Sequence, residues 1–425
     1  MQRFLSIVSN LWRAEDLRRR VIITLGLLML FRLAANVPLP DVDLDRIRTL
    51  LSSNQFLGIL NVFAGNTLSN LSIAMLGVGP YITATIIMQL LTMIYPRLKE
   101  IYYEEGEAGR AKFNQYARLL TIPLAVLQAF GFLKFLQAQQ IIFFVGLYPL
   151  FRDVIIVTAG TMFIMWLGEL ITEQKLSNGT SLIIFSGIVA RGPDLLRQVA
   201  VGFNAAQINS YLILILMSVL IIAGVVFVTE AERRVPLNFA KRVRGSKIYG
   251  GASTYLPIRV NQAGVMPIIF ALSVLLFPVT LGQILSASGL TVFKSMADVV
   301  NHLFQNQGIF SLLYFLLVFG FTYFYTAITF EPHEMAQNFQ KSGAFIPGIR
   351  PGQETAKFLQ RLVSRVTLFG AAFLGLIAVL PNITQSLTGL RFAGLGGTSI
   401  LILVAVALES IKQVEGELSV RRYEV

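Results

Sequence analysis

Long stretches without a charged residue dominate the chain. Residues 49–96 contain no Asp, Glu, Lys or Arg over 48 positions, and residues 198–229, 260–293 and 299–330 form similar runs of 32, 34 and 32 residues. Because the hydrocarbon core of a bilayer is about 30 Å thick and a helix rises about 1.5 Å per residue, a spanning helix needs about 20 mostly apolar residues. The runs are continuous rather than alternating, which excludes a transmembrane β-barrel. The pattern predicts an all-α polytopic membrane protein.

Ten segments are expected to span the membrane. They cover residues 21–37, 71–95, 117–136, 154–171, 180–200, 209–229, 262–284, 309–330, 362–383 and 396–411. The fifth is the weakest, because Arg191, Pro193 and Asp194 interrupt it and leave only residues 181–190 as an apolar stretch. Before the first span, apolar side chains share one helical face, which is typical of a helix on the membrane surface. These side chains are Phe4, Val8, Leu11 and Trp12.

The basic residues predict the orientation of the spans. The 425-residue chain is 55% hydrophobic and 14% charged, and its formal net charge is +12. When the 35 Lys and Arg residues are assigned to alternating sides, 26 fall on the side of the two termini, 8 on the other side and Arg32 inside the first span. Lys and Arg accumulate on the cytoplasmic side of membranes. We therefore expect both termini in the cytosol, and we expect Arg32 to reach the outer surface or to pair.

This orientation limits how many times the longest apolar run, residues 49–96, can cross the membrane. The run could hold two spans, but a crossing by residues 56–63 would move the basic loop that follows the second span to the outside. We therefore expect a short half-helix at about residues 54–67 that enters from outside without crossing. Irregular backbone at membrane depth is tolerated only inside protein or against a water-filled cavity. A re-entrant segment therefore indicates transport.

The residues that enzymes and ion-coupled carriers use are scarce. The chain has no cysteine and two histidines, and it contains no G-x-x-x-x-G-K-[ST] phosphate-binding motif. Its acidic residues near the spans, Glu169, Glu173 and Glu409, are expected at cytosolic ends rather than at mid-membrane. We expect no catalytic residue, no metal site and no cofactor. A secondary transporter built from inverted repeats and an intramembrane enzyme are the alternatives to a passive conduit.

Two long cytosolic loops, residues 230–260 and 331–361, are candidates for docking a partner. Their basic residues could meet ribosomal RNA phosphates or the acidic surface of a motor protein, whereas the simpler alternative is a pair of solvated loops that obey the positive-inside pattern. The candidates are Lys241, Arg242, Arg244, Lys247 and Arg350. Arg350 stands out because Pro347 and Pro351 stiffen the turn that presents it.

The sequence of residues 341–352, Lys-Ser-Gly-Ala-Phe-Ile-Pro-Gly-Ile-Arg-Pro-Gly, resembles a signature of the SecY family of protein translocation channels. Other similar segments follow in the same order along nearly the whole chain. They include residues 79–82, 89–92, 106–110, 165–169, 178–181, 240–242, 261–267 and 396–399. The resemblance implies two pseudo-symmetric halves of five spans each, residues 1–200 and 201–425, with a plug half-helix in the first.

The resemblance also implies a function and a set of partners. It implies a passive channel that moves unfolded secretory polypeptides across the bacterial cytoplasmic membrane and releases hydrophobic segments sideways into lipid. A SecA motor ATPase or a ribosome would drive transport, SecE and SecG would be companion subunits, and signal peptides and nascent or precursor polypeptides would be the substrates. Membrane lipid is an expected contact, and DNA is not an expected partner.

Three groups of site residues follow from the same resemblance. A ring of aliphatic side chains is expected at the waist of the pore: Val78, Ile82, Ile184, Ile269, Ile400 and Ile402. The plug is expected to contain Phe56, Leu57, Gly58, Ile59, Leu60, Asn61, Val62 and Phe63. Gln89 and Asn261 match polar positions at a lateral gate. The chain departs from the family at two places, with Thr180 where an aliphatic residue is expected and Ser246 where a basic one is expected.

Overall fold

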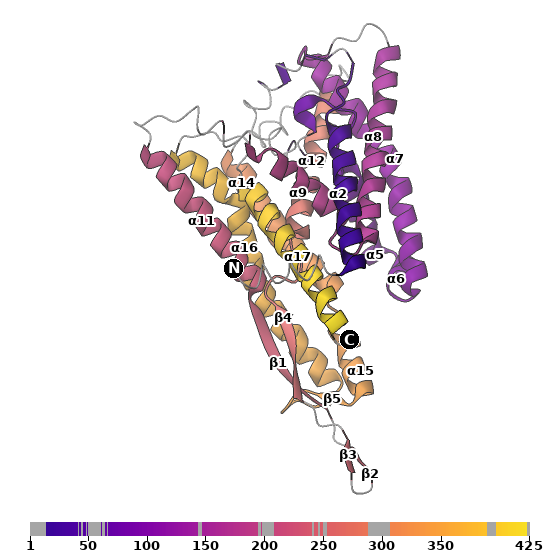
Figure 1. The fold of residues 1–425 in the computed structure, drawn as a ribbon, viewed down its shortest axis with the longest axis vertical. Helices are drawn as coiled ribbons and strands as arrows, with labels where there is room; N and C mark the ends of the chain where they lie inside the picture. Colours follow the sequence, from indigo (N-terminus) through magenta and orange to yellow (C-terminus); the bar gives the residue numbers. More distant parts are fainter. Residues whose placement is uncertain are drawn as a thin grey trace.

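A computed structural model provides the fold of most of the chain. The residues that it describes are 14–40, 42, 43, 46, 47, 49, 61, 64, 65, 67–142, 147–193, 197, 208–239, 242–244, 247–249, 253–287, 307–388 and 397–422. The expected surface helix at residues 4–12 lies outside them. The structure is helical in its body, with strands in a protrusion below it (Figure 1).

Ten helices of the described chain correspond one to one with the ten expected spans. They are α2 (Glu15–Ala35), α5 (Gly79–Ile94), α7 (Gly106–Ala138), α8 (Tyr148–Glu173), α9 (Gly179–Ala190), α11 (Ile208–Glu230), α12 (Met266–Ala287), α14 (Gln307–Thr329), α16 (Gln353–Thr388) and α17 (Gly397–Arg422). Five of them are long and apolar enough to qualify as spans by length and composition alone. The predicted polytopic, all-α membrane fold is confirmed.

Two of the predicted span boundaries were wrong. Residues 71–78 form turns, and α5 begins only at Gly79, where Pro80 favours the first turn of a helix. The fifth helix, α9, ends at Ala190 rather than near residue 200, as the interruption after residue 190 suggested. Its start is fixed by Asn178, whose Oδ1 accepts hydrogen bonds from the backbone N–H groups of Thr180 and Ser181 at 3.0 and 3.4 Å.

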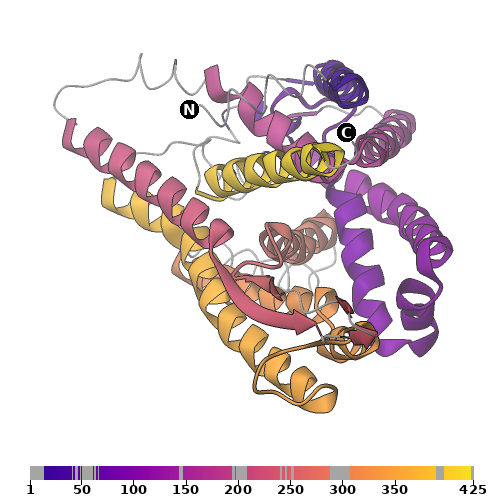
Figure 2. The ribbon, with the colours of Figure 1, turned by 60° about the horizontal axis from the view of Figure 1, so that its bottom comes forward.

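The helices pack around a shared apolar core. Helix α12 packs against α5 and α7 as well as α14, and α17 packs against α9, α11 and α16. Figure 2 shows α11 and α16 side by side on one flank, with α17 crossing the middle of the body. Helices early and late in the chain therefore meet along extended contacts, and the core contains side chains from both groups.

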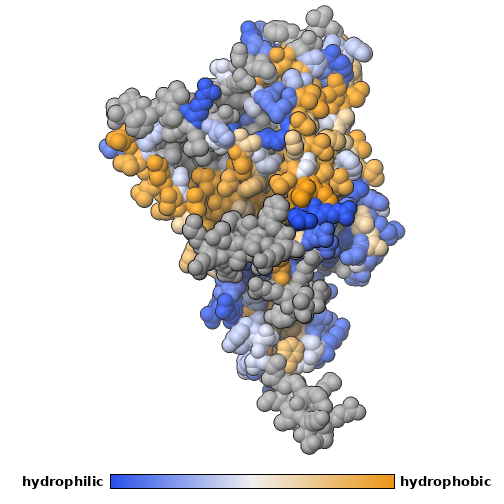
Figure 3. Space-filling view, viewed as in Figure 1, coloured by the Kyte–Doolittle hydropathy of each residue, from blue (hydrophilic) through white to orange (hydrophobic). Residues whose placement is uncertain are grey.

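The outside of the helical body is apolar. Large hydrophobic side chains are exposed along α2, α7, α8, α11 and α14, and in α11 they include Leu216 and Phe227 at 66% and 70% exposure. Figure 3 shows hydrophobic residues over the helical body, with hydrophilic residues below it. This surface suits lipid contact, because an exposed apolar belt of this extent is unfavourable in water.

The two long loops that were expected in the cytosol contribute strands and a helix to a protrusion with its own small core. Strand β1 (Glu232–Phe239) pairs antiparallel with β4 (Ser253–Arg259) and with β5 (Ala344–Phe345). A second hairpin, β2 (Arg242–Arg244) with β3 (Lys247–Tyr249), lies farthest from the helical body (Figure 1). Apolar side chains of the sheet pack against the start of α16, and helix α15 (Pro332–Ser342) leads into β5. The sequence did not predict these strands.

Two short helical elements complete the described fold. Helix α6 (Pro96–Tyr103) connects α5 to α7, and a 3-10 turn, η1 (Leu68–Asn70), lies in the segment before α5. We use the name outer loop for Asn61, Ala64, Gly65 and residues 67–78, which lead from the expected plug into α5. The outer loop pairs with the segment that follows α2. The N–H of Leu39 donates to the carbonyl of Leu71, and the N–H of Ile73 donates to the carbonyl of Val37.

Close packing of α8 against the outer loop predicts the effect of a single methyl group. A Cβ atom at Gly160 would collide with the backbone carbonyl of Ile73. We expect Gly160→Ala to lower the free energy of unfolding by about 1–3 kcal/mol, since overpacking forces backbone shifts. The matched control is Gly320→Ala in α14, where a Cβ would meet no atom within 4 Å. Thermal unfolding in detergent measures both variants, and equal midpoints would contradict the prediction.

Candidate functional site

The six residues expected in the pore ring come together in one apolar cluster. Five of them, Val78, Ile82, Ile184, Ile269 and Ile402, are at most 5% exposed, and Ile400 is partly buried against the same cluster. They come from the end of the outer loop and from α5, α9, α12 and α17. The cluster thus joins early and late helices through dispersion and hydrophobic contacts alone. Its role as a pore constriction stays a prediction.

Polar side chains help to hold the outer loop, together with the backbone hydrogen bonds of its turns. The Oδ1 of Asn61 accepts hydrogen bonds from the N–H groups of Leu68 and Ser69, both at 3.1 Å. The Thr67 hydroxyl lies 2.9 Å from the carbonyl of Ala64 and donates to it. Of the expected plug residues, only Asn61 is described, in helical conformation and fully buried. Phe56, Leu57, Gly58, Ile59, Leu60, Val62 and Phe63 lie outside the described residues.

Each of the two expected gate amides has a buried side-chain oxygen with no hydrogen-bond partner among the described residues. Asn261 is 6% exposed and its side-chain NH₂ donates to the nearby carbonyl of Gly264 at 3.0 Å. The Oδ1 of Asn261 and the Oε1 of Gln89 are both buried, and neither accepts a hydrogen bond from any described residue. Among the described residues no hydrogen bond joins the two amides. Each therefore keeps one free acceptor, which a new partner could use.

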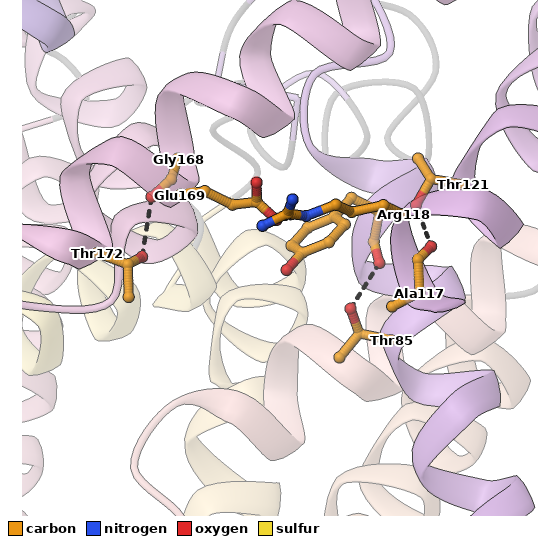
Figure 4. Close-up of polar contacts among 8 residues, drawn as sticks. Thr85, Ala117, Arg118, Thr121, Gly168, Glu169 and Thr172 are labelled. Carbon is orange, nitrogen blue, oxygen red and sulfur yellow. Dashed lines mark hydrogen bonds and ion pairs between the residues drawn. The ribbon is translucent and has the colours of Figure 1, made fainter. Parts of the chain in front are cut away.

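An ion pair ties α7 to α8 at the predicted cytosolic end of the body. The Nε of Arg118 lies 2.6 Å from Oε1 of Glu169, and Figure 4 shows the two side chains pointing toward one another. Glu169 is largely buried, with 16% of its side chain exposed. Nearby threonines, including Thr121 and Thr172, donate to carbonyls one turn back in their own helices. The pair fixes two helices and contributes no charge at mid-membrane.

The Arg350 loop is exposed but firmly held. The Thr355 hydroxyl donates to the carbonyl of Arg350 at 2.9 Å, and the N–H of Ile349 donates to the carbonyl of Ile346. Gly348 and Gly352 have φ values of +79° and +98°, which favour glycine. Ile346 is buried in the core of the protrusion, so the backbone around the exposed Arg350 is fixed to the sheet.

Three of the four remaining basic candidates lie at the tip of the protrusion. Arg242, Arg244 and Lys247 lie in the β2–β3 hairpin, where Arg242 pairs with Tyr249 and Arg244 with Lys247 along the backbone. Lys241 lies outside the described residues. The structure thus places Arg350 and the hairpin on one protrusion, which the order of residues alone did not indicate.

Sequence analysis missed two ion pairs on α17. Arg20 of α2 contacts Glu417 at 3.0 Å, and Lys412 contacts Glu230 of α11 at 2.8 Å. Residues this far apart in sequence cannot be paired from composition or spacing. The inner end of α17 is therefore tied to the first helix of each expected half. No group of three or more His, Cys, Asp or Glu that could hold a metal ion occurs within the described ranges.

Comparisons with known proteins agree on one family. The family model described as SecY matches residues 72–411. The chain is 43% identical over 432 residues to the protein translocase subunit SecY of Thermus thermophilus, covering 98% of this chain and 97% of that protein. It is 40% identical over 418 residues to the same subunit of a Synechocystis species, covering 97% and 94%. A solved structure of a protein-conducting channel aligns with a TM-score of 0.65 at 18% identity, over 93% of this chain and 91% of that one.

Proposed function

The chain belongs to the SecY family, and from that premise we propose that it is a passive channel for unfolded secretory polypeptides that also releases hydrophobic segments into the lipid. It is a multi-pass membrane protein and a protein translocation channel. The observation that supports the conduit best is the apolar cluster that α5, α9, α12 and α17 share. A purely apolar waist can part around a polypeptide and close again, since no directional bond has to be broken.

The waist also accounts for a seal against ions. A narrow constriction lined by aliphatic side chains excludes water by dewetting, so ions and protons meet an energy barrier there. The pore ring in this proposal is Val78, Ile82, Ile184, Ile269 and Ile402, with Ile400 beside it. In this proposal the expected plug, residues 54–67, supplies a second barrier on the outer side of this ring. The two barriers act in series.

Sideways release requires the two halves, residues 1–200 and 201–425, to separate along one seam. In this proposal the seam runs between α5 and α7 on one side and α12 and α14 on the other, and α12 packs against both α5 and α7. The free amide oxygens of Gln89 and Asn261 offer hydrogen-bond acceptors to a segment that enters the seam. An apolar signal helix would replace helix–helix contacts with contacts of its own, so opening costs little.

Energy for transport comes from a partner in the cytosol. The exposed Arg350 and the basic β2–β3 hairpin form a positively charged protrusion that fits an acidic motor surface or ribosomal RNA. By family, the partners are the SecA ATPase, the ribosome and the small subunits SecE and SecG. The side with 26 of the 35 basic residues faces the cytosol, so both termini are cytosolic and the membrane is the bacterial cytoplasmic membrane.

Reconstitution tests the channel function directly. The purified chain would be placed in liposomes with SecE and SecG, and then given SecA, ATP and a precursor that carries a signal sequence. We expect the precursor to become protected from added protease only when ATP is present. A precursor without its signal sequence is the control. Full protease sensitivity of the signal-bearing precursor in the presence of ATP would contradict the proposal.

Removing bulk from the waist should make the channel leak. In the double variant Ile82→Gly plus Ile184→Gly, two buried side chains disappear from the apolar ring. The resting ion conductance in planar bilayers should rise severalfold, because the constriction widens and becomes wet.

A matched double variant controls for the loss of two isoleucines. Ile155 in α8 and Ile215 in α11 are 67% and 58% exposed on the apolar outer surface. Replacing both with glycine should leave resting conductance at the parent value. A conductance that rises equally in both double variants would remove Ile82 and Ile184 from the ring.

Reversing one charge on the protrusion should block the motor. Arg350→Glu is expected to abolish SecA-driven transport while the protein still inserts and folds, because the exposed guanidinium would be replaced by a repelling carboxylate. Lys341→Glu, an exposed charge reversal at the end of α15, is the control and should retain transport. Equal losses in the two variants would indicate general charge attraction and would refute a specific contact at Arg350.

A further inference from the structure

Arg32 is a charged residue inside the first span, and its contacts join three parts of the chain. It lies in the last turn of α2. One guanidinium nitrogen, Nη1, donates to the carbonyl of Gly65 at 3.3 Å, and the other, Nη2, donates to the carbonyl of Gly187 at 3.3 Å. Gly65 belongs to the outer loop and Gly187 to α9. One side chain therefore bridges the first span, the outer loop and the fifth span.

The end of α9 favours a cation at this place. Gly187 lies in the last turn of α9, where carbonyl groups lose their helical partners and the helix dipole is negative. The N–H of Arg191, which would continue the helix by donating to Gly187, instead donates to Ile188 at 3.2 Å. The carbonyl of Gly187 accepts a hydrogen bond from Arg32 at this helix end. A planar guanidinium can serve two separate carbonyls at once, which a lysine ammonium on one stem cannot do with the same geometry.

Glycines around this contact let the backbones approach closely. A Cβ atom on Gly187 would collide with the backbone of Gly65, and a Cβ on Gly65 would lie 2.9 Å from Cζ of Phe31. A Cβ on Gly77 would lie 2.6 Å from the carbonyl oxygen of Ala64. Gly65 and Gly77 also have positive φ values of +74° and +54°. The Ala64–Gly65 turn is therefore enclosed by α2, α9 and the end of the outer loop, and Ala64 is 2% exposed.

We propose that Arg32 is a positioning residue that holds the Ala64–Gly65 turn against α9 and thereby keeps the resting channel closed to ions. A charge within a span is costly. If hydration of the charge were the only requirement, the Arg32 side chain could extend toward the outer membrane surface. Arg32 instead turns inward to two backbone carbonyls. The inference rests on the proposed channel function, because it assigns a gating role to a contact on the outer side of the pore ring.

The absence of cysteine from the chain allows a direct test. A single thiol, Ala64→Cys, reports whether the turn is enclosed. In the parent channel in lipid nanodiscs, its reaction with a water-soluble maleimide should be slow. With Arg32→Gln added, the reaction should accelerate about tenfold, which corresponds to about 1.4 kcal/mol in the opening equilibrium. Resting ion conductance of Arg32→Gln in the cysteine-free chain should rise in parallel, and Arg32→Lys should give intermediate values.

A second variant leaves Arg32 intact, so the test does not depend on the folding of Arg32→Gln. Gly187→Ala should push the turn away from α9 and raise resting conductance, whereas Gly192→Ala, where a Cβ would meet no atom within 4 Å, should not. Unchanged labelling and conductance in Arg32→Gln, or equal effects of the two alanines, would overturn the role of Arg32. Failure of the parent channel to protect a precursor would instead overturn the channel function, so the two failures are distinguishable.

Discussion

Inside a bilayer no water is available to satisfy a backbone N–H or C=O group, and this constraint governs the whole structure. Helices meet it without help, because each pairs its own backbone groups. The outer loop does not, since residues 71–78 are turns in a span that is otherwise helical. Its backbone groups find partners in the hydrogen bonds of its turns, in the segment that follows α2, and in polar side chains. The Asn61 side chain accepts hydrogen bonds from the N–H groups of Leu68 and Ser69. The Thr67 hydroxyl donates to the carbonyl of Ala64, and the Arg32 guanidinium donates to the carbonyl of Gly65.

The same constraint explains why the central contact between the helices is apolar. Across the central cluster the helices meet through side chains such as Ile82, Ile184 and Ile269, which have no polar atoms to leave unpaired when they separate. Directional contacts occur elsewhere, at the Arg118–Glu169 pair and at the inner end of α17. The molecule thus combines helices fixed by ion pairs with a central contact that depends on shape and dispersion.

The number of the spans was predictable because it depends on long, local runs of apolar residues, whereas their orientation, which follows from summed charge, stays a prediction. Boundaries were less predictable. Hydropathy alone extended the second span to residue 71, since the turn residues 71–78 are as apolar as helix α5 itself. The β1–β4 sheet was missed because its pairing is long-range, with Glu232 opposite Arg259. The Arg32 contacts were missed for a related reason: Gly65 and Gly187 lie far apart in sequence, and a glycine reveals close packing only once its neighbours are known.

Helix α16 belongs to two cores at once. Near its start, Leu359 and Val363 pack under the cytosolic sheet, and farther along, Leu374 and Ile377 pack in the central cluster. These two sets are separated by about 22 Å along the axis, at about 1.5 Å per residue. A helix resists compression and bending over such a length, so α16 links the protrusion and the central cluster through one continuous element. A displacement of the protrusion would therefore reach the central cluster along the axis of one helix, without passing through any loop.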